Sequence, residues 1–196
     1  MSTTDIESHP WQPFIPDHAK ILIMGTFPPK PERWSMDFYY PNRINDFWRM
    51  MGLVFFDNKD RFWDQESKQF RLDDIKRLLI ERGIALSDTG AAVRRLKDNA
   101  SDKYLEIVKP VNLDGLLKIM PECIAVATTG QKAAQVIADL TSTPLPAMGE
   151  CIATTRSDSD RRIDIYRMPS TSRAYPMALE KKAAYYARMF EKTGLI

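Results

Sequence analysis

The chain has 196 residues, of which 44% are hydrophobic and 28% charged, an ordinary composition for a globular protein that can bury a sizeable core. Its formal net charge of +2 is too small to identify a nucleic-acid partner, although a local basic face is compatible with it. Its two cysteines, Cys123 and Cys151, lie far apart and exclude an iron–sulfur cluster held by cysteines alone, which needs about four thiolates.

The N-terminal residues 1–19 are polar and interrupted by prolines. We expect an irregular segment that Trp11, Phe14 and Ile15 anchor to the rest of the protein. It lacks a basic region followed by a long apolar segment, and no apolar run of the chain approaches the roughly 20 residues of a membrane span. We therefore expect one domain over residues 1–196, with no membrane contact. It would work as a monomer in the cytoplasm, or on the nucleoid if the source is bacterial.

The first buried strand is predicted over residues 20–25, Lys-Ile-Leu-Ile-Met-Gly, because this run is short, apolar and stopped by a glycine. A loop over residues 26–29, Thr-Phe-Pro-Pro, follows it. Ligands of open α/β sheets bind outside the carboxyl ends of the strands, so this loop is a candidate wall of a site. Gly25 would let the backbone approach a ligand closely.

Residues 38–48, Phe-Tyr-Tyr-Pro-Asn-Arg-Ile-Asn-Asp-Phe-Trp, crowd aromatic rings, amides and an arginine in front of a helical pattern. That pattern runs through Phe47, Trp48 and Met51. Tyrosines and amides before a helix start suit a pocket that stacks on a flat ring and hydrogen-bonds its edge. The alternative is an aromatic-rich loop packed into the core. The local chemistry leaves both interpretations open.

A second helix begins at Asp73 and is ended by Gly83, after a segment of mixed composition over residues 53–71. The run 84–88 predicts another buried strand, which ends in polar residues. Its last residue, Asp88, is either a polar pocket residue or a turn former.

Residues 91–111 predict a long, partly irregular connection. It carries a basic cluster of Arg94, Arg95 and Lys97. Such a cluster is either solvated surface or a group of cations that face phosphates.

The second half of the chain continues to alternate between strand and helix. Helical faces are predicted from Leu113 to Met120, from Ala133 to Leu140 and from Leu179 to Phe190, and buried strands over 123–127 and 163–168. The run 151–155 is either the other arm of a hairpin or a loop leading into the last strand. This alternation predicts an α/β fold, a three-layer α/β/α sandwich with a central four-stranded, mainly parallel sheet.

Several familiar sites can be set aside. The two histidines, His9 and His18, both lie in the N-terminal segment, which argues against a Ser-His-Asp triad or a histidine-rich metal site. No Walker or dinucleotide glycine fingerprint is present, and we expect no metal and no cofactor. The predicted strand ends carry aromatic rings, amides and hydroxyls near helix starts, together with Arg173, a combination typical of nucleotide-binding sites.

Three segments, 25–29, 40–48 and 168–173, resemble in order and spacing the uracil-DNA glycosylase superfamily. Asn-Asp-Phe-Trp within the second segment resembles the Asn-x-Phe-Trp of the mismatch-specific uracil/thymine glycosylases. Met-Pro-Ser-Thr-Ser-Arg is similar to their second active-site motif. The paired tyrosines followed by Arg43 and Asn45 look closest to the hypoxanthine-DNA glycosylase branch.

This resemblance implies a monofunctional DNA glycosylase that hydrolyses the N-glycosidic bond of a deaminated base, of the uracil or hypoxanthine type. Such enzymes flip the nucleotide out of single- or double-stranded DNA at a cost of about a few kcal/mol. The resemblance implies Asn45 as the catalytic residue, which would orient water or bind the base edge. The chain departs from the family at Phe27, where the thymine/uracil branch has its water-positioning asparagine, and at Pro29, which replaces a glycine.

The resemblance also implies a base pocket and a DNA-contacting surface. The pocket would comprise Gly25, Thr26, Phe27, Tyr39, Tyr40 and Asp88; the DNA contacts would come from Pro28, Ser170, Thr171, Ser172 and Arg173. Tyr40 would stack on the base, and Arg173 would fill the gap that the flipped nucleotide leaves. Two alternatives remain at this point. One is a relative that binds DNA or nucleotides without catalysis, and the other is a hydrolase of free nucleosides.

Overall fold

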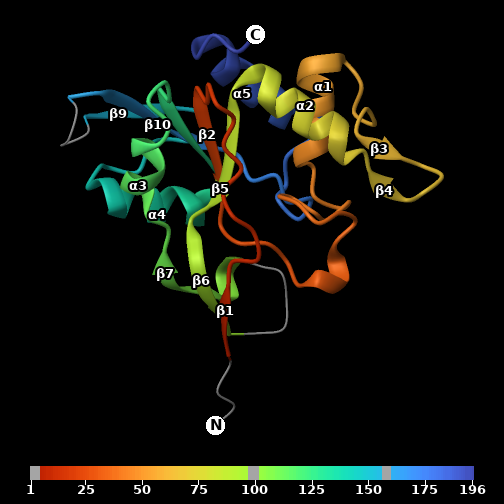
Figure 1. Ribbon diagram of the computed structural model, residues 1–196, viewed down its shortest axis with the longest axis horizontal. Helices are drawn as coiled ribbons and strands as arrows, with labels where there is room; N and C mark the ends of the chain where they lie inside the picture. Colours follow the sequence, from red (N-terminus) through yellow and green to blue (C-terminus); the bar gives the residue numbers. More distant parts are fainter. Residues whose placement is uncertain (1–4, 97–101, 156–159) are drawn as a thin grey trace.

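The computed structural model describes residues 5–96, 102–155 and 160–196. A five-stranded sheet crosses the middle of the molecule in the order β5-β2-β8-β10-β9 (Figure 1). Its strands are β2 (Ile21–Gly25), β5 (Ile84–Asp88), β8 (Ala125–Thr129), β9 (Cys151–Thr155) and β10 (Arg162–Met168). The neighbours from β5 to β10 are parallel, and β9 is antiparallel to β10. The mainly parallel sheet is confirmed, but the expected number of four strands is wrong.

The additional strand is β9, at one edge of the sheet. Its residues are half-buried or exposed, whereas every residue of β2, β5 and β8 is buried. A half-exposed run lacks the continuous apolar character that identifies an internal parallel strand. Its place in the sheet depends on its antiparallel pairing with β10, which runs from Thr155 opposite Arg162 to Cys151 opposite Tyr166.

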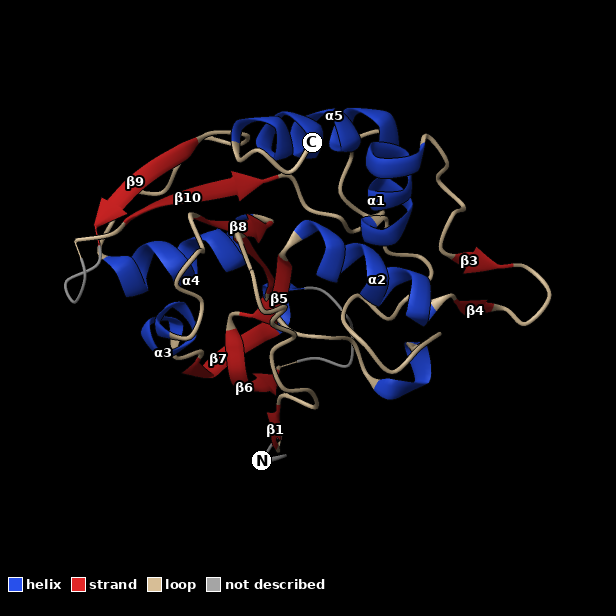
Figure 2. Cartoon of the chain, turned by 45° about the horizontal axis from the view of Figure 1, so that its top comes forward, coloured by secondary structure: helices blue, strands red, loops and turns tan. Residues whose placement is uncertain are grey.

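Helices cover both faces of the central sheet (Figure 2). The helices are α1 (Phe47–Phe56), α2 (Leu72–Arg82), α3 (Leu113–Lys118), α4 (Gln131–Thr141) and α5 (Leu179–Lys192). The first, second and fifth pack in one core with Ile21 and Ile23 of β2; α3 and α4 pack in the other with Leu22 and Met24. Successive residues of a strand point to opposite faces, so β2 supplies both cores. The three-layer α/β/α sandwich is therefore confirmed.

A second sheet, of three antiparallel strands, extends the molecule below the first (Figure 1). It consists of β1 (Ile6–Ser8), β6 (Gly90–Arg95) and β7 (Leu105–Pro110), in the order β1-β6-β7. The expectations of an irregular N-terminal segment and of an irregular connection over 91–111 are therefore wrong in part. The sequence signal is weak because β6 contains alanines and arginines with a single large apolar residue, Val93, so that its pairing rather than its composition makes it a strand.

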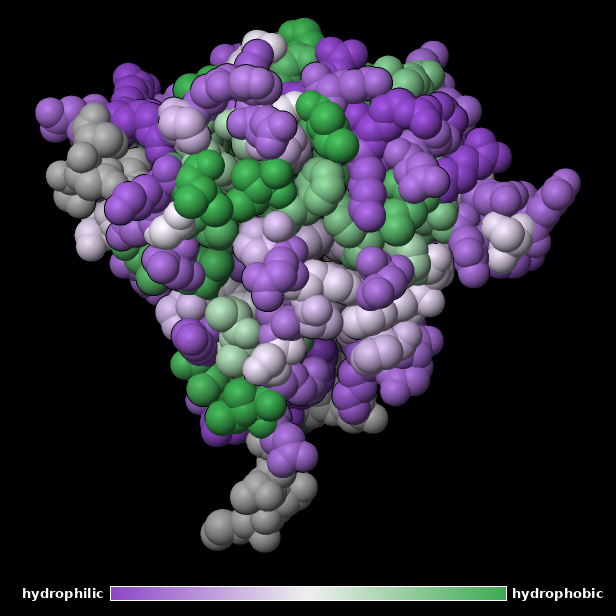
Figure 3. Space-filling view, viewed as in Figure 1, coloured by the Kyte–Doolittle hydropathy of each residue, from purple (hydrophilic) through white to green (hydrophobic). Residues whose placement is uncertain are grey.

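The remaining described elements are short. A two-stranded hairpin, β3 (Trp63–Asp64) and β4 (Gln69–Phe70), lies between α1 and α2, and 3-10 turns cover Pro31–Arg33 and Asp102–Tyr104. The lower end of the molecule shows an apolar area over the three-stranded sheet (Figure 3), where Ile6, Leu96 and Val108 are at least 40% exposed. Among the helices that the structure describes, none has the length and apolarity needed to cross a bilayer.

Candidate functional site

A cavity of about 550 Å³ opens at the carboxyl ends of the parallel strands. Parallel strands end at the same edge of a sheet, so the loops that follow them meet there. The cavity is lined by Gly25, Thr26, Phe27, Pro28, Pro29, Arg33, Tyr40, Pro41, Asn42, Ile44, Asn45, Asp88, Arg95, Leu105, Thr129, Ser170, Thr171, Ser172, Arg173, Ala174, Tyr175 and Pro176. It therefore unites the three segments that sequence analysis singled out.

Two of these segments meet directly, although they lie far apart in the chain. Asn45 and Ser172 form an isolated antiparallel bridge, and the backbone N–H of Asp46 donates a hydrogen bond of 2.8 Å to the carbonyl of Thr171. The loop after β10 (blue) accordingly meets the loop before α1 (orange) in Figure 1. This contact brings the amide of Asn45 to the part of the cavity wall, here called the rim, that carries Ser170 and Ser172.

Asn45 lines the cavity and lies two residues before the first residue of α1. Its Oδ1 accepts a hydrogen bond of 2.9 Å from the backbone N–H of Phe47, one of the amides that a helix start leaves without an internal partner. Because a backbone N–H can only donate, the oxygen must be the atom that faces Phe47. Among the described residues, none accepts a hydrogen bond from Nδ2, so this group is free to donate to a ligand in the cavity.

Asp46 ties the two segments to α5. Its Oδ2 accepts a hydrogen bond of 3.0 Å from Lys182 Nζ, and its Oδ1 accepts one of 3.0 Å from Arg173 Nε and another of 3.0 Å from Arg49. Lys182 is fully buried and also donates to the carbonyl of Ser172 at 2.8 Å. Burial by itself raises the pKa of Asp46, but the hydrogen bonds from Lys182 and Arg173 outweigh it and hold the pKa below its usual value. The carboxylate is therefore ionised and fixes the rim in place.

Arg173 is part of this cluster rather than a free side chain. Besides Asp46, it reaches the carbonyl of Arg43 with one terminal nitrogen at 3.4 Å, and its side chain is 43% exposed. The hydroxyls of Ser170 and Ser172 also form hydrogen bonds within their own turn. Ser170 Oγ accepts from the N–H of Ser172, and Ser172 Oγ from the N–H of Ala174, both at 3.2 Å. These bonds hold the 170–174 turn in one shape at the rim.

Of the two adjacent tyrosines, Tyr39 and Tyr40, only Tyr40 lines the cavity. Tyr40 lines the cavity, stacks on Phe47 with centroids 3.8 Å apart and places its hydroxyl 3.2 Å from Thr129 Oγ1. Burial, followed by the charge of Asp88, raises the pKa of Tyr40 well above its usual value, so the phenol is neutral. Tyr40 has a left-handed backbone (φ +52°), a conformation that costs a bulky residue about 1–3 kcal/mol and that is concentrated at functional sites.

Tyr39, expected in the same pocket, is not among the residues that line the cavity. It is 1% exposed, and its hydroxyl donates a hydrogen bond of 3.1 Å to the carbonyl of Gln12. The two successive rings therefore lie in different surroundings, one in the cavity and one against the N-terminal segment.

A histidine that sequence analysis set aside reaches the site. His9 Nε2 lies 2.9 Å from Asp88 Oδ2, and these side chains are 11% and 8% exposed. The imidazole stacks on Tyr39 at 5.6 Å and contacts the ring of Phe27 edge-on at 5.3 Å. The pairing of β1 with β6, continued by the bond from His9 N to the carbonyl of Ala91, carries it there. No local pattern in the sequence signals this placement.

The other oxygen of Asp88 lies over Gly25. A Cβ atom built on Gly25 would come within 2.6 Å of Asp88 Oδ1 and 3.3 Å of the Tyr40 hydroxyl, so a larger residue at this position would displace one of them. Among the described residues, Oδ1 has no hydrogen-bond partner, whereas Oδ2 binds His9. The carboxylate thus presents one unpaired acceptor beside Tyr40.

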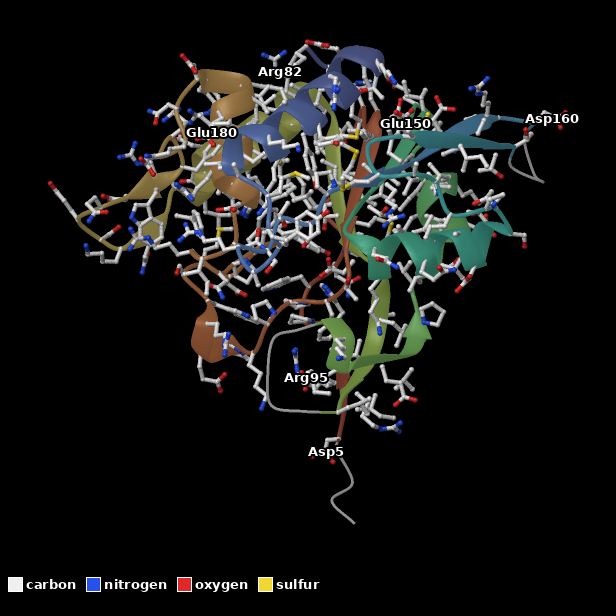
Figure 4. All side chains as sticks on the ribbon, turned by 180° about the vertical axis from the view of Figure 1, so that it is seen from behind. Asp5, Arg82, Arg95, Glu150, Asp160 and Glu180 are labelled. Atoms are coloured by element: carbon white, nitrogen blue, oxygen red, sulfur yellow. The ribbon has the colours of Figure 1, made fainter. Side chains whose placement is uncertain are left out.

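The basic cluster of β6 is divided between core and surface. Arg95, labelled in Figure 4, is 8% exposed. It donates to Glu7 at 2.9 Å and to the carbonyl of Pro28 at 2.8 Å, a bond that holds the 26–29 loop. Arg94 forms a more exposed pair with Glu106 at 2.6 Å, and Lys97 lies outside the described residues. Over the described ranges, no group of three or more His, Cys, Asp or Glu side chains could hold a metal ion.

No family model matches the chain, and no curated protein does. Among solved structures it is similar to the solution NMR structure of "a putative Uracil DNA glycosylase" from Methanosarcina acetivorans, with a TM-score of 0.61. The two sequences are 19% identical, over 97% of this chain and 99% of that one. At this identity the likeness concerns the fold, a uracil-DNA-glycosylase-like α/β arrangement around a mostly parallel sheet.

Proposed function

We propose that this protein is a DNA glycosylase that hydrolyses the N-glycosidic bond of a deaminated base, of the uracil or hypoxanthine type. The observation that carries the proposal is the convergence of residues 40–45 and 170–173 on one cavity at the carboxyl edge of the sheet. These segments carry the resemblance to the superfamily, and the similar solved structure is named for that activity. Such a monomer would act on DNA in the cytoplasm, or on the nucleoid in a bacterium.

The chemistry needs hydrogen-bond donors for the departing base. When the bond from C1′ to the base nitrogen breaks, its electron pair leaves with the base, and positive charge develops on the sugar. Water then adds to C1′, and the proton that it loses neutralises the departed base, so that a neutral base and a C1′ hydroxyl result. Oδ1 of Asn45 accepts from the N–H of Phe47, whereas Nδ2 is free to donate to an oxygen of the departing base. Of the two roles considered for Asn45, this geometry supports stabilisation of the leaving base.

Two further residues suit a base in this cavity. Tyr40, backed by Phe47, offers a neutral ring for stacking. Asp88 offers Oδ1 as an acceptor, and a hydrogen bond from His9 orients the carboxylate. Uracil and hypoxanthine carry a ring N–H where cytosine and adenine carry a bare ring nitrogen, which a carboxylate oxygen would repel. We therefore assign Asp88 to recognition of the ring N–H.

The test is base release from oligonucleotides that carry uracil, hypoxanthine or xanthine, with enzyme in excess. We expect the wild type to release at least one of these bases. Asn45→Ala and Asn45→Asp should both lose about 10²–10³-fold in rate, the usual effect of removing one donor to developing negative charge. Asn45→Asp keeps an oxygen that can accept from the N–H of Phe47, so its loss of rate reports the missing donor rather than a change of fold. Asn58→Ala removes a comparable turn asparagine outside the cavity and should leave the rate unchanged. No release of any base by the wild type would overturn the proposal.

A binding protein without catalysis is the second candidate, and Phe27 is the observation that favours it. Its ring contacts His9 and lies 5.6 Å from the guanidinium of Arg95, in the place where the thymine/uracil branch has its water-positioning asparagine. This candidate predicts salt-dependent DNA binding without base release, and binding that Arg173→Ala weakens.

A further inference from the structure

The tip of the turn before α1 is an exposed apolar side chain at the mouth of the cavity. Ile44 is 56% exposed and lines the cavity. Its backbone N–H donates to Asn42 Oδ1 at 3.0 Å, the N–H of Asn45 donates to the carbonyl of Asn42 at 2.9 Å, and Asn45 is bridged to Ser172. A single exposed isoleucine is ordinary on a protein surface. This one differs because a braced turn holds it at the entrance of the candidate site.

Two arginines belong to this turn or contact it, and the side chains of both are held in place. The guanidinium of Arg43 lies 4.3 Å from the ring centroid of Trp63. Arg173 contacts the turn on both sides of Ile44, through the carbonyl of Arg43 and the carboxylate of Asp46. Both arginine side chains remain exposed. An apolar side chain on a turn that carries Arg43 and is contacted by Arg173 suits a base stack with phosphates beside it.

We propose that Ile44 is the wedge that enters the base stack of duplex DNA and occupies the space of the flipped nucleotide, while Arg43 and Arg173 bind the flanking phosphates. This inference rests on the proposed glycosylase function, for which it names the residue that opens the duplex. Proteins that unstack DNA insert apolar side chains between base steps. The branched side chain of isoleucine has few rotamers and so keeps its direction during insertion.

Arg173, which the sequence suggested for this place, is less suited to it. Insertion would break its bond of 3.0 Å to Asp46 and move a charge between apolar base faces. Staying on Asp46, it can still donate from its terminal nitrogens to a phosphate oxygen. We therefore assign insertion into the base stack to Ile44 and binding of the DNA phosphates to Arg43 and Arg173.

The experiment compares one sequence as duplex and as single strand, each with the target base beside a 2-aminopurine, whose fluorescence rises when it is unstacked. Ile44→Ala should lower single-turnover base release from the duplex by about tenfold or more, because part of the unstacking cost of a few kcal/mol is no longer met. Release from the single strand should stay within about twofold. The rise in 2-aminopurine fluorescence on duplex binding should disappear, and Ile44→Leu should restore both signals.

Ile119→Ala is the matched control, since Ile119 is 63% exposed and does not line the cavity. Arg173→Ala should weaken binding to both DNA forms and reduce the slope of log affinity against log salt by about one. An equal loss on duplex and single strand, or an unchanged duplex rate and fluorescence in Ile44→Ala, would overturn the wedge. The fluorescence readout needs no cleavage. A wild-type protein that unstacks DNA but releases no base would therefore contradict the proposed function and not the wedge.

Discussion

His9 and Asp88 approach to 2.9 Å beside the cavity, although one belongs to the N-terminal segment and the other ends β5. The antiparallel pairing of β1 with β6 makes this contact, because β6 begins two residues after Asp88 and its partner strand ends one residue before His9. One oxygen of the carboxylate is thereby committed to the imidazole and the other remains available over Gly25. The N-terminal strand therefore contributes to the candidate site itself.

Asp88→Asn tests whether this carboxylate recognises the ring N–H. The amide oxygen can still accept from His9, while its NH₂ group replaces the acceptor that faces the cavity. We expect release of hypoxanthine or uracil to fall by about 10²-fold or more, because a site built for a hydrogen bond discriminates strongly when that bond is lost. The measurement is single-turnover release from matched oligonucleotides.

A second substrate, in which a methyl group replaces the hydrogen of this ring N–H, tests the same hydrogen bond from the side of the base. Wild type should reject it, and Asp88→Asn should process the methylated and unmethylated bases at similar rates. Asp64→Asn, at a carboxylate of β3 outside the cavity, is the control. If Asp88→Asn still discriminated between the two bases as the wild type does, Asp88 would not read the ring N–H.

We expect His9→Ala to slow base release by disturbing the orientation of the Asp88 carboxylate. Without the imidazole, the carboxylate loses its described side-chain partner and the support that orients it. We expect slower base release and a smaller loss of DNA affinity, since His9 does not line the cavity. Restoration by His9→Gln, whose amide can donate to Asp88, would identify positioning as the role. His18→Ala, at a histidine with an 80% exposed side chain, should have no effect on release.

Asp46 predicts a pH-dependent contribution to stability. Its folded-state pKa lies below the ordinary value of 3.8, so its contribution is fully present above that value and is lost as the pH falls through the folded pKa. Removal of one partner from a buried charge cluster typically costs about 3–5 kcal/mol. We expect Asp46→Asn to lower the free energy of unfolding by about that amount at neutral pH, and by progressively less below about pH 4.

Urea unfolding of wild type and variant across this pH range measures the difference. Asp60→Asn affects an exposed pair with Lys59 at 3.8 Å and should change stability by less than about 1 kcal/mol at any pH. A difference between Asp46→Asn and wild type that did not vary with pH would contradict the assignment.

Tyr40→Phe and Tyr40→Ala separate the hydroxyl from the ring. Phenylalanine keeps the stack on Phe47 and loses only the contact of 3.2 Å with Thr129. We expect it to retain most of the activity, whereas alanine should lose roughly the 1–3 kcal/mol that stacking of a base on an aromatic ring provides. Because the pKa of Tyr40 is raised well above its usual value, wild type and Tyr40→Phe should show the same pH profile up to about pH 10. Rates measured over pH for both proteins provide the test.

Gly25→Ala tests the close approach of the backbone to Asp88. The added methyl group would lie 2.6 Å from Asp88 Oδ1, so the carboxylate or the backbone must move. We expect base release to fall by about tenfold or more, since displacement of a site group by about 1 Å can cost 10²-fold. Circular dichroism and the urea midpoint will show whether the fold persists. Full activity in this variant would mean that the position of Asp88 is not important for catalysis.

The sequence by itself determined the parallel core and the place of the candidate site. Short apolar runs such as residues 20–25 and 84–88 predict buried strands because a strand covered on both faces needs continuous apolar residues. The ends of such strands share one edge, so the loops after Gly25 and Met168 could be placed together before the structure was known. The residues that carry the family resemblance lie in those loops and before α1.

Only the tertiary structure decided which side chains meet there. His9 reaches Asp88 through strand pairing, Arg173 binds Asp46, and only one of two adjacent tyrosines lines the cavity. The edge strand β9 and the sheet of β1, β6 and β7 likewise depend on hydrogen bonds to distant segments. Local sequence patterns do not predict these features, and the physical reason is the same for all of them. A half-exposed strand or a single polar contact derives its stability from a partner remote in sequence, whereas a buried strand carries its signal in its own apolar residues.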